Sequence, residues 1–184
     1  FWSVKATEKT AINGQWIKGP GLDFFKAVAV RLPNLEIIAE DLGITTAAVE
    51  KLRKAAGFPG MRVLQFGFPL DEPNDHHAPH MHSADSVVYC GSEAQRDHVR
   101  RYLSIDGKDI AWQLMRVAEQ SVGELCILSV QDLLSLDASA RMNVPGEAKG
   151  NWAWRMTDSL PGWIADRLRE MTFLYGRRPL DPIR

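Results

Sequence analysis

Cysteine, long apolar runs and targeting signals are scarce or missing in this sequence, and each absence excludes a class of protein. Only two cysteines occur among 184 residues, Cys90 and Cys126, both within apolar runs and far apart in the chain. We therefore expect reduced, buried thiols in a cytoplasmic protein rather than a disulfide framework. Apolar residues never run for the roughly 20 positions that a membrane-spanning helix needs. The N-terminus has neither an initiator Met nor the pattern of a secretory signal.

An excess of charge of either sign is also absent. The 22 Lys and Arg residues are balanced by 23 Asp and Glu residues, which gives a formal net charge of -1. Such a chain has no electrostatic footprint for nucleic acid or an anionic membrane, so we expect neither as a partner. A hydrophobic share of 45% and a charged share of 24% are ordinary for globular proteins. The length suits one globular core or part of a larger one.

Helical and strand-like segments alternate along the chain, which is typical of an α/β fold with a parallel sheet. Helical spacing covers residues 22–32, 46–56, 93–103, 110–122 and 159–175, and short apolar runs suited to strands cover 35–43, 61–68, 86–91 and 125–130. Four strands are too few to close an eight-stranded barrel. The pattern therefore predicts part of a (β/α)8 barrel within one domain over residues 1–184, with a functional loop at 1–21 and a loose tail at 176–184.

The run at residues 35–43 ends in two adjacent carboxylates, Glu40 and Asp41, followed by Gly43. It reads as a strand covered on both faces. Carboxylates at the C-terminal end of a barrel strand lie where catalytic residues are found. The same pair could instead open a loop and cap the next helix. Residue spacing leaves both interpretations open.

Two irregular segments are rich in aromatic and polar side chains. For Trp2 and Trp16, within residues 1–21, packing against the body of the protein competes with contact to a ligand. Residues 140–156 combine asparagines, arginines and glycines with Trp152 and Trp154. Amides and guanidinium groups bind sugar hydroxyls and aromatic rings stack on sugar faces, so this segment could form a sugar site. The two tryptophans could equally fill a core.

Four of the five histidines, His76, His77, His80 and His82, fall within residues 69–85. No helix is predicted there to hold two of them on one face, and their spacing matches no regular metal site. We therefore expect no metal, and a polar loop in which one histidine hydrogen-bonds a ligand. A metal-dependent hydrolase that uses this loop is the competing hypothesis.

Several segments share a sequence pattern with one known family, in the family's order and over nearly the whole chain. They cover residues 8–14, 38–43, 60–66, 131–134, 140–146 and 150–155. Together they resemble amylomaltase, the 4-alpha-glucanotransferase of glycoside hydrolase family seventy-seven. The resemblance implies a (β/α)8 barrel of the α-amylase clan, of which this chain is the C-terminal half with about four strands. It also implies transfer of an α-1,4-glucan segment to glucose or a maltodextrin with retention of configuration, without a cofactor.

The resemblance gives individual residues a role. The acid/base is the glutamate of the Ala-Glu-Asp-Leu-Gly motif, here Glu40. A glutamate in this role works at neutral pH where apolar surroundings or a neighbouring negative charge favour its protonated form, and Ile37, Ile38, Ala39 and Asp41 could supply both. The candidates for binding a maltooligosaccharide are Asp41, Trp16, Phe66, His80 and Asn143.

Two catalytic carboxylates of the family have no counterpart in this sequence. The nucleophile belongs to an Arg-Ile-Asp-His-Phe-Arg-Gly motif that would stand shortly before Phe1. The family's Tyr-Thr-Gly-Thr-His-Asp motif, which holds the transition-state stabiliser, begins at residues 89–91 and then breaks off. Without a gap, residues 93–94 replace its His-Asp pair. With a gap, the His-Asp loop is missing; we prefer the gap because the match resumes at Ser92. In either alignment Asp97 is too far along the next helix to be the stabiliser.

We therefore expect the 184-residue chain to be inactive alone, because a retaining mechanism needs two carboxylates. The leading hypothesis is the C-terminal half of a cytoplasmic 4-alpha-glucanotransferase with Glu40 as acid/base. The alternative is a glucan-binding or assembly module of the same family without catalysis.

Overall fold

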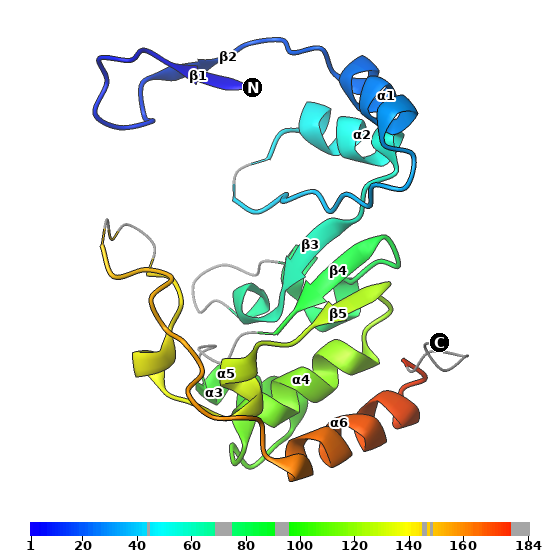
Figure 1. The fold of residues 1–184 in the computed structure, drawn as a ribbon, viewed down its shortest axis with the longest axis vertical. Helices are drawn as coiled ribbons and strands as arrows, with labels where there is room; N and C mark the ends of the chain where they lie inside the picture. Colours follow the sequence, from blue (N-terminus) through cyan, green and yellow to red (C-terminus); the bar gives the residue numbers. More distant parts are fainter. Residues whose placement is uncertain (44, 69–74, 91–95, 145–146, 148, 178–184) are drawn as a thin grey trace. The chain divides into compact units, whose positions relative to one another are not determined.

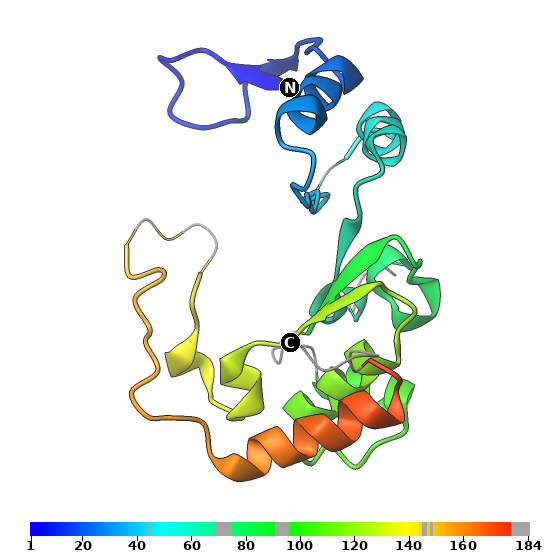
Figure 2. The ribbon, with the colours of Figure 1, turned by 45° about the vertical axis from the view of Figure 1, so that its right-hand side comes forward.

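The computed structural model describes residues 1–43, 45–68, 75–90, 96–144, 147 and 149–177, and Figures 1 and 2 give the course of the chain. The chain forms two compact units, Phe1–Gly60 and Met61–Arg184, and each is described by itself. Two predictions lie outside the described residues. One concerns residues 93–94, aligned with the family's His-Asp pair, and the other the tail beyond residue 177. Each described helix is too short or too polar to cross a membrane.

The first unit contains a β-hairpin and two helices. The hairpin pairs β1 (Trp2–Val4) with β2 (Gly14–Trp16) antiparallel, and the helices are α1 (Leu22–Arg31) and α2 (Ala47–Ala56). The prediction of an irregular loop over residues 1–21 is therefore wrong at residues 2–4 and 14–16. Strands of three residues are too short to display alternation in the sequence. Trp2 and Trp16 pair across the hairpin, with ring centroids 5.6 Å apart, which supplies the stabilising cross-strand contact.

Helix α2 begins and ends where its sequence predicts. The Thr46 hydroxyl accepts a hydrogen bond from the backbone N–H of Val49, which satisfies one of the unpaired donors of the first turn. At the other end Gly57 adopts a left-handed conformation with φ of 72°, which costs a residue without a side chain little. Both caps are local in sequence, and α1 was likewise predicted to within one residue.

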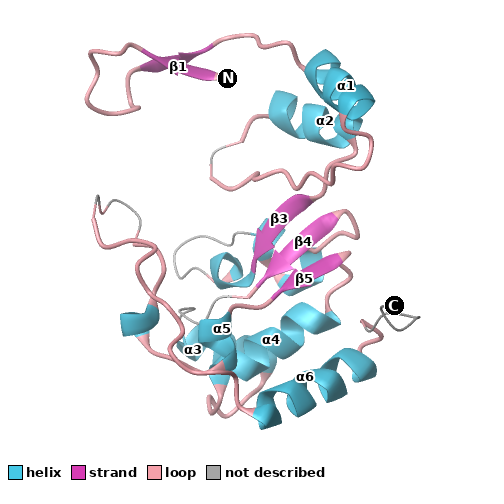
Figure 3. Cartoon of the chain, viewed as in Figure 1, coloured by secondary structure: helices cyan, strands magenta, loops and turns pink. Residues whose placement is uncertain are grey.

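The second unit contains a three-stranded sheet in the order β3-β4-β5, shown in magenta in Figure 3. Its strands are β3 (Gly60–Val63), β4 (Ser86–Tyr89) and β5 (Leu125–Ile127). Strands β4 and β5 are parallel, with Val87 opposite Leu125 and Tyr89 opposite Ile127. The α/β class with a parallel sheet is confirmed, but the sheet has three strands over the described residues and does not close into a barrel.

The predicted strand at residues 61–68 ends early. After Val63 the chain continues as a 3-10 helix, Leu64–Gly67. Leu64 and Phe68 are buried all the same. An apolar run therefore predicted burial correctly and strand length wrongly, because both conformations can bury these side chains.

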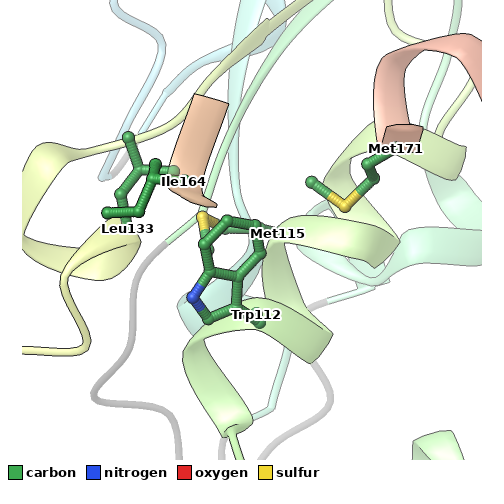
Figure 4. Packing of buried hydrophobic residues seen from close by; sticks show 5 residues of the cluster. All are labelled: Trp112, Met115, Leu133, Ile164 and Met171. Atoms are coloured by element: carbon green, nitrogen blue, oxygen red, sulfur yellow. The ribbon is translucent and has the colours of Figure 1, made fainter. Parts of the chain in front are cut away.

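The other helices of this unit are α3 (Arg96–Leu103), α4 (Ile110–Gln120), α5 (Val130–Leu133) and α6 (Gly162–Leu174), together with the short 3-10 turns Asp75–His77, Pro79–Met81 and Ala138–Ala140. Helix α4 is buried on two sides. One side contacts the sheet through Val117 and Ala118, which pack with Val88 of β4. The other side packs against α5 and α6, as Figure 4 shows, through Trp112, Met115, Leu133, Ile164 and Met171.

Asp109 directly precedes α4 and is a residue type that often caps helices, but its side chain does not cap this one. The carboxylate instead accepts a hydrogen bond of 2.6 Å from Arg167 of α6. The guanidinium of Arg167 also lies 4.0 Å from the centroid of the Trp112 ring, an arrangement that favours a cation–π contact. A tertiary partner thus replaces the local cap.

Both cysteines are free thiols, as predicted. They lie at the sheet, where Cys126 belongs to β5 and the Cys90 thiol donates a hydrogen bond of 3.0 Å to the Asp132 carboxylate. Burial, and then the nearby Glu119, raises the pKa of Cys126 to about 12. Burial, and then Asp132, raises the pKa of Cys90 as well.

We predict that both thiols react slowly in the native protein. Because the thiolate is the nucleophile, reaction with a disulfide reagent at pH 8 should be on the order of 100-fold slower than for free cysteine. The rate is followed by absorbance, with the urea-unfolded protein as the control in which both thiols react. Both cysteines are half-buried, and a native protein that labels both within seconds would contradict their protonated state.

Candidate active site

The segment that carries Glu40 forms neither a helix nor a strand, so the prediction of a buried strand at residues 35–43 is wrong. Leu35 and Ile38 are 52% and 41% exposed. A strand needs hydrogen-bonded neighbours, and within the described residues no strand pairs with this segment. Its backbone is fastened at Ala39, whose N–H donates to the carbonyl of Pro59 at 2.9 Å.

Side chains alternate in burial along this segment. Ala39 and Asp41 are half-buried and Glu40, between them, is exposed. Successive side chains of an extended chain point to opposite sides. The alternation of burial is consistent with this arrangement, in which Glu40 is open to solvent while Ala39 and Asp41 are partly covered. The apolar surroundings predicted for Glu40 are not formed by the described residues of its unit.

The neighbouring carboxylate, Asp41, is held by Arg53 of α2. Its Oδ2 lies 3.6 Å from the Arg53 Nε, and the two side chains are 9% and 4% exposed. The side chain of Asp41 also covers Gly60, where a Cβ atom would lie 2.3 Å from the same carboxylate oxygen. The role of Asp41 in binding substrate stays a prediction. In the structure its carboxylate contacts Arg53 and Gly60.

Arg53 makes further contacts inside the first unit. Its Nη1 donates to the carbonyl of Phe58 at 2.7 Å, and its Nε and Nη2 donate to the two carboxylate oxygens of Glu50 at 3.1 and 3.0 Å. The hydrogen bond from Arg53 outweighs burial and, with that from Lys54, lowers the pKa of Glu50 to about 2. Arg53 thus joins the Glu40 segment, helix α2 and the turn that follows it.

The predicted sugar contact Trp16 also belongs to the first unit. Its ring meets that of Trp2 edge to face, and both rings are exposed. The Trp2 indole N–H donates to the carbonyl of Ala11 at 2.8 Å. The hairpin therefore presents two aromatic rings to solvent, a composition suited to sugar contact.

Phe66 and His80, the predicted contacts to sugar, belong to the second unit. They lie in the part of the chain that holds His77 and His82, which form hydrogen bonds within the protein. Phe66 meets the ring of His77 edge to face at 5.5 Å, and His77 Nδ1 accepts the backbone N–H of Val63 at 3.0 Å. His80 Nδ1 lies 2.8 Å from the Tyr102 hydroxyl. Over the described part of the chain, no three His, Cys, Asp or Glu side chains gather where they could hold a metal ion.

His82 is the buried histidine whose protonation we expect to affect folding. Its Nε2 donates to the carbonyl of His77 at 3.1 Å, and burial holds its pKa below the usual 6.5. A histidine with a lowered pKa contributes stability that is present above pH 6.5 and is lost as pH falls through the folded pKa.

We predict that the melting temperature of the protein falls between pH 7 and pH 5, and that the fall is smaller in His82→Asn. The matched control is His76→Gln, which changes an exposed histidine of the same segment. Thermal unfolding followed by circular dichroism measures the effect. Equal pH slopes in the wild type and His82→Asn would contradict it.

The predicted contact Asn143 is exposed in an irregular loop organised by Asn151. The Asn151 Oδ1 accepts the backbone N–H of Val144 at 2.7 Å, and its Nδ2 donates to the carbonyl of Glu147 at 2.8 Å. Trp152, the next residue, has a positive φ of 61° and is 63% exposed. Trp152 therefore does not fill a core of the described residues.

Three residues that organise these segments were not singled out by the sequence. In the sequence Arg53 looks like any basic residue in the last turn of a helix, where a positive charge interacts favourably with the helix dipole. Asp132 and Asn151 lie within residues 131–134 and 150–155, two of the segments that resemble the family. That resemblance was the signal in the sequence that could have identified them. Asp132 is buried and accepts hydrogen bonds from Cys90 and from the Ser129 hydroxyl, the latter at 2.7 Å.

The structure brings Glu40 together with Asp41 in the first unit, which also holds Trp16 on the hairpin. Phe66, His80 and Asn143 belong to the second unit, on separate segments. Their predicted roles in binding stay predictions. Asp97, which the sequence excluded as the stabiliser, is part of α3.

Comparison with known proteins links these segments to one enzyme family. The family model for 4-alpha-glucanotransferase of glycoside hydrolase family 77 matches residues 1–160. The 4-alpha-glucanotransferase of Synechocystis sp. is 42% identical over 97% of this chain and 39% of its own length. The chloroplastic/amyloplastic 4-alpha-glucanotransferase of Arabidopsis thaliana is 39% identical over 96% of this chain and 34% of its own length.

The fold is similar as well. The structure of amylomaltase from Streptococcus agalactiae in complex with acarbose matches with a TM-score of 0.84 and 30% identity, over 96% of this chain and 39% of that protein. The chain thus spans between a third and two fifths of the length of these relatives. Over that span, sequence and fold agree, and the chain belongs to the family of 4-alpha-glucanotransferases.

Proposed function

We propose that this chain supplies the acid/base residue of a retaining 4-alpha-glucanotransferase, and that Glu40 is this residue. The observation that carries the proposal is the placement of Glu40 in its Ala-Glu-Asp-Leu-Gly motif. Its neighbours are bound, Ala39 to Pro59 and Asp41 to Arg53, while its own carboxyl is exposed. An anchored backbone with an open carboxyl suits proton transfer to a bound sugar.

In this mechanism Glu40 acts twice. It first protonates the glycosidic oxygen of an α-1,4-glucan while a second carboxylate attacks the anomeric carbon from the opposite face. It then takes a proton from the hydroxyl of an incoming glucose or maltodextrin, which attacks the glycosyl-enzyme intermediate. Two displacements at one carbon give net retention. Neither step calls for a cofactor.

The second carboxylate has no candidate in this chain that fits the family's motif. We therefore also propose that residues 1–184 are the C-terminal half of a single (β/α)8 domain, whose remaining part supplies the nucleophile. The fold similarity over 96% of the chain supports this arrangement. Two free thiols favour a reducing compartment such as the cytoplasm.

Substrate binding is proposed for the exposed polar and aromatic residues of the chain. The rings of Trp16 and Phe66 are candidates for stacking on glucose units, and Asn143 and His80 for bonding their hydroxyls. Asp41, the neighbour of Glu40 in the motif, is a further candidate for binding the substrate. The proposed ligand is a maltooligosaccharide.

A glucan-binding module without catalysis is the second candidate. It is favoured by the exposed ring of Trp152, which is available for contact with a sugar. Calorimetry with maltoheptaose distinguishes the candidates. Binding that survives Glu40→Gln, with no transfer even by the full-length protein, would support the module.

Disproportionation of maltotriose tests the enzymatic proposal. We expect the full-length protein to form glucose and longer maltodextrins, and the 184-residue chain alone to form neither, because a retaining enzyme without its nucleophile loses several orders of magnitude in rate. Products are separated by chromatography. Transfer by the isolated chain at a rate similar to the full-length protein would refute the proposed division of catalytic residues.

A further inference from the structure

Arg53 is a buried guanidinium at the end of α2, and its position calls for an explanation. Burying a charge is costly unless it is paired and hydrogen-bonded. Its side chain is 4% exposed and lies against the carboxylates of Asp41 and Glu50 and the carbonyl of Phe58. These three partners come from three different segments of the first unit. Arg53 therefore fixes those segments relative to one another.

The contacts use the shape of the guanidinium. Arg53 meets both carboxylate oxygens of Glu50 with two nitrogens, and its third nitrogen reaches Phe58. A planar fork of donors can hold this geometry, whereas the single ammonium of a lysine cannot span it. Glu50, with its pKa lowered to about 2, keeps its charge from mildly acidic to alkaline pH. The pair therefore stays intact across a pH profile.

We propose that Arg53 is a positioning residue that sets the direction of Glu40. The inference rests on the proposed function of Glu40. Asp41 is held by Arg53 at 3.6 Å and Ala39 by the carbonyl of Pro59 at 2.9 Å. With Asp41 held by α2 and Ala39 by the turn that follows the helix, Glu40 is left exposed between two fixed neighbours.

Gly60 completes the arrangement. Its missing side chain leaves room for the Asp41 carboxylate, since a Cβ atom would lie 2.3 Å from Oδ2. Gly60 does not have a positive φ, so an alanine there would strain the contact with Asp41 and not the backbone conformation. Arg53 and Gly60 thus act on the same carboxylate from independent positions.

The experiment compares Arg53→Lys with Lys54→Met in the full-length protein. Lys54 also contacts Glu50, at 3.2 Å, but its side chain is solvent-exposed. Because misplacing a catalytic group by about 1 Å can cost about 100-fold in rate, we expect kcat for maltotriose to fall about 10- to 100-fold in Arg53→Lys. KM should change less than about threefold, and kcat of Lys54→Met less than about twofold. The alkaline limb of the pH–rate profile should move to higher pH in Arg53→Lys, because Asp41 loses part of its compensation.

Gly60→Ala is the second variant, and it decides the result if Arg53→Lys does not fold by circular dichroism. It should lower kcat in the same direction with little change in KM. Wild-type kcat in folded Gly60→Ala, or in folded Arg53→Lys, would overturn the positioning role. Failure of the proposed function is recognised separately, by wild-type transfer in Glu40→Gln.

Discussion

Replacing Glu40 by glutamine in the full-length protein is expected to lower kcat for maltotriose by about 100- to 10,000-fold. The amide has the size of the carboxyl but can neither give a proton to the glycosidic oxygen nor take one from the acceptor. Because Glu40 is exposed and lies between two fastened neighbours, the substitution leaves the folding contacts of its segment in place. The loss should therefore appear in kcat, with an unchanged melting temperature.

A donor that needs no protonation sharpens this test. Maltosyl fluoride loses fluoride without help from an acid, so formation of the glycosyl-enzyme should be much less impaired in Glu40→Gln than cleavage of maltotriose. The matched control is Glu36→Gln, an exposed glutamate of the same segment, which should keep kcat within about twofold. Equal losses with both donors would contradict the acid/base role.

Replacing Arg177 by methionine is expected to cost about 3–5 kcal/mol of unfolding free energy, the largest effect on stability that we predict. Arg177 follows α6 and binds the end of α4. Its Nε donates to the carbonyl of Glu119 and its Nη2 to that of Ser121, both at 2.7 Å. Its Nε also lies 3.5 Å from the Glu119 carboxylate, whose side chain is 5% exposed. The substitution leaves that carboxylate buried without its cation.

The urea-unfolding experiment has two internal controls. Glu119→Gln in the Arg177→Met background should recover part of the loss, because it removes the unpaired buried charge. Arg169→Met breaks a pair of similar length, 2.6 Å to Asp166, but both side chains are exposed, so we expect a change within about 0.5 kcal/mol. Equal losses in Arg177→Met and Arg169→Met would contradict the structural role of Arg177.

The effect of Arg177 should also depend on pH. Burial raises the pKa of Glu119 above the usual 4.5, and Arg177 opposes that rise. A group with a raised pKa contributes stability that is present below pH 4.5 and is lost as pH rises through the folded pKa. Without Arg177 the pKa of Glu119 rises further. The destabilisation by Arg177→Met should therefore be smaller at pH 5 than at pH 7.5.

Local patterns predicted most helices well. In α2, the hydroxyl of Thr46 and the left-handed Gly57 are caps made by residues next to the helix. In α6, Ile164 and Met171 are buried as their spacing predicted. The loose tail expected from residue 176 was wrong at Arg177, whose hydrogen bonds reach residues more than 50 positions away. Such contacts leave no trace in local spacing.

The candidate site divides in the same way. The motif around Glu40 is contiguous, so its resemblance to the family identified the acid/base candidate directly. The strand predicted around it depends on hydrogen-bonded neighbours, and apolar spacing does not reveal whether they are present. Trp152 is similar: its loop was recognised from composition, whereas the exposure of its ring follows from the bonds of Asn151.

The sequence by itself determined the α/β class, the free thiols, the family and the choice of Glu40, because each depends on composition or on residues close together in the chain. Tertiary structure decided that Glu40 is exposed and what holds its neighbours Ala39 and Asp41. The Arg53 contacts with Asp41 and Phe58 and the room left by Gly60 arise from segments that meet only when the unit folds. The motif names the proposed acid/base carboxyl, and contacts between distant segments hold its two neighbours.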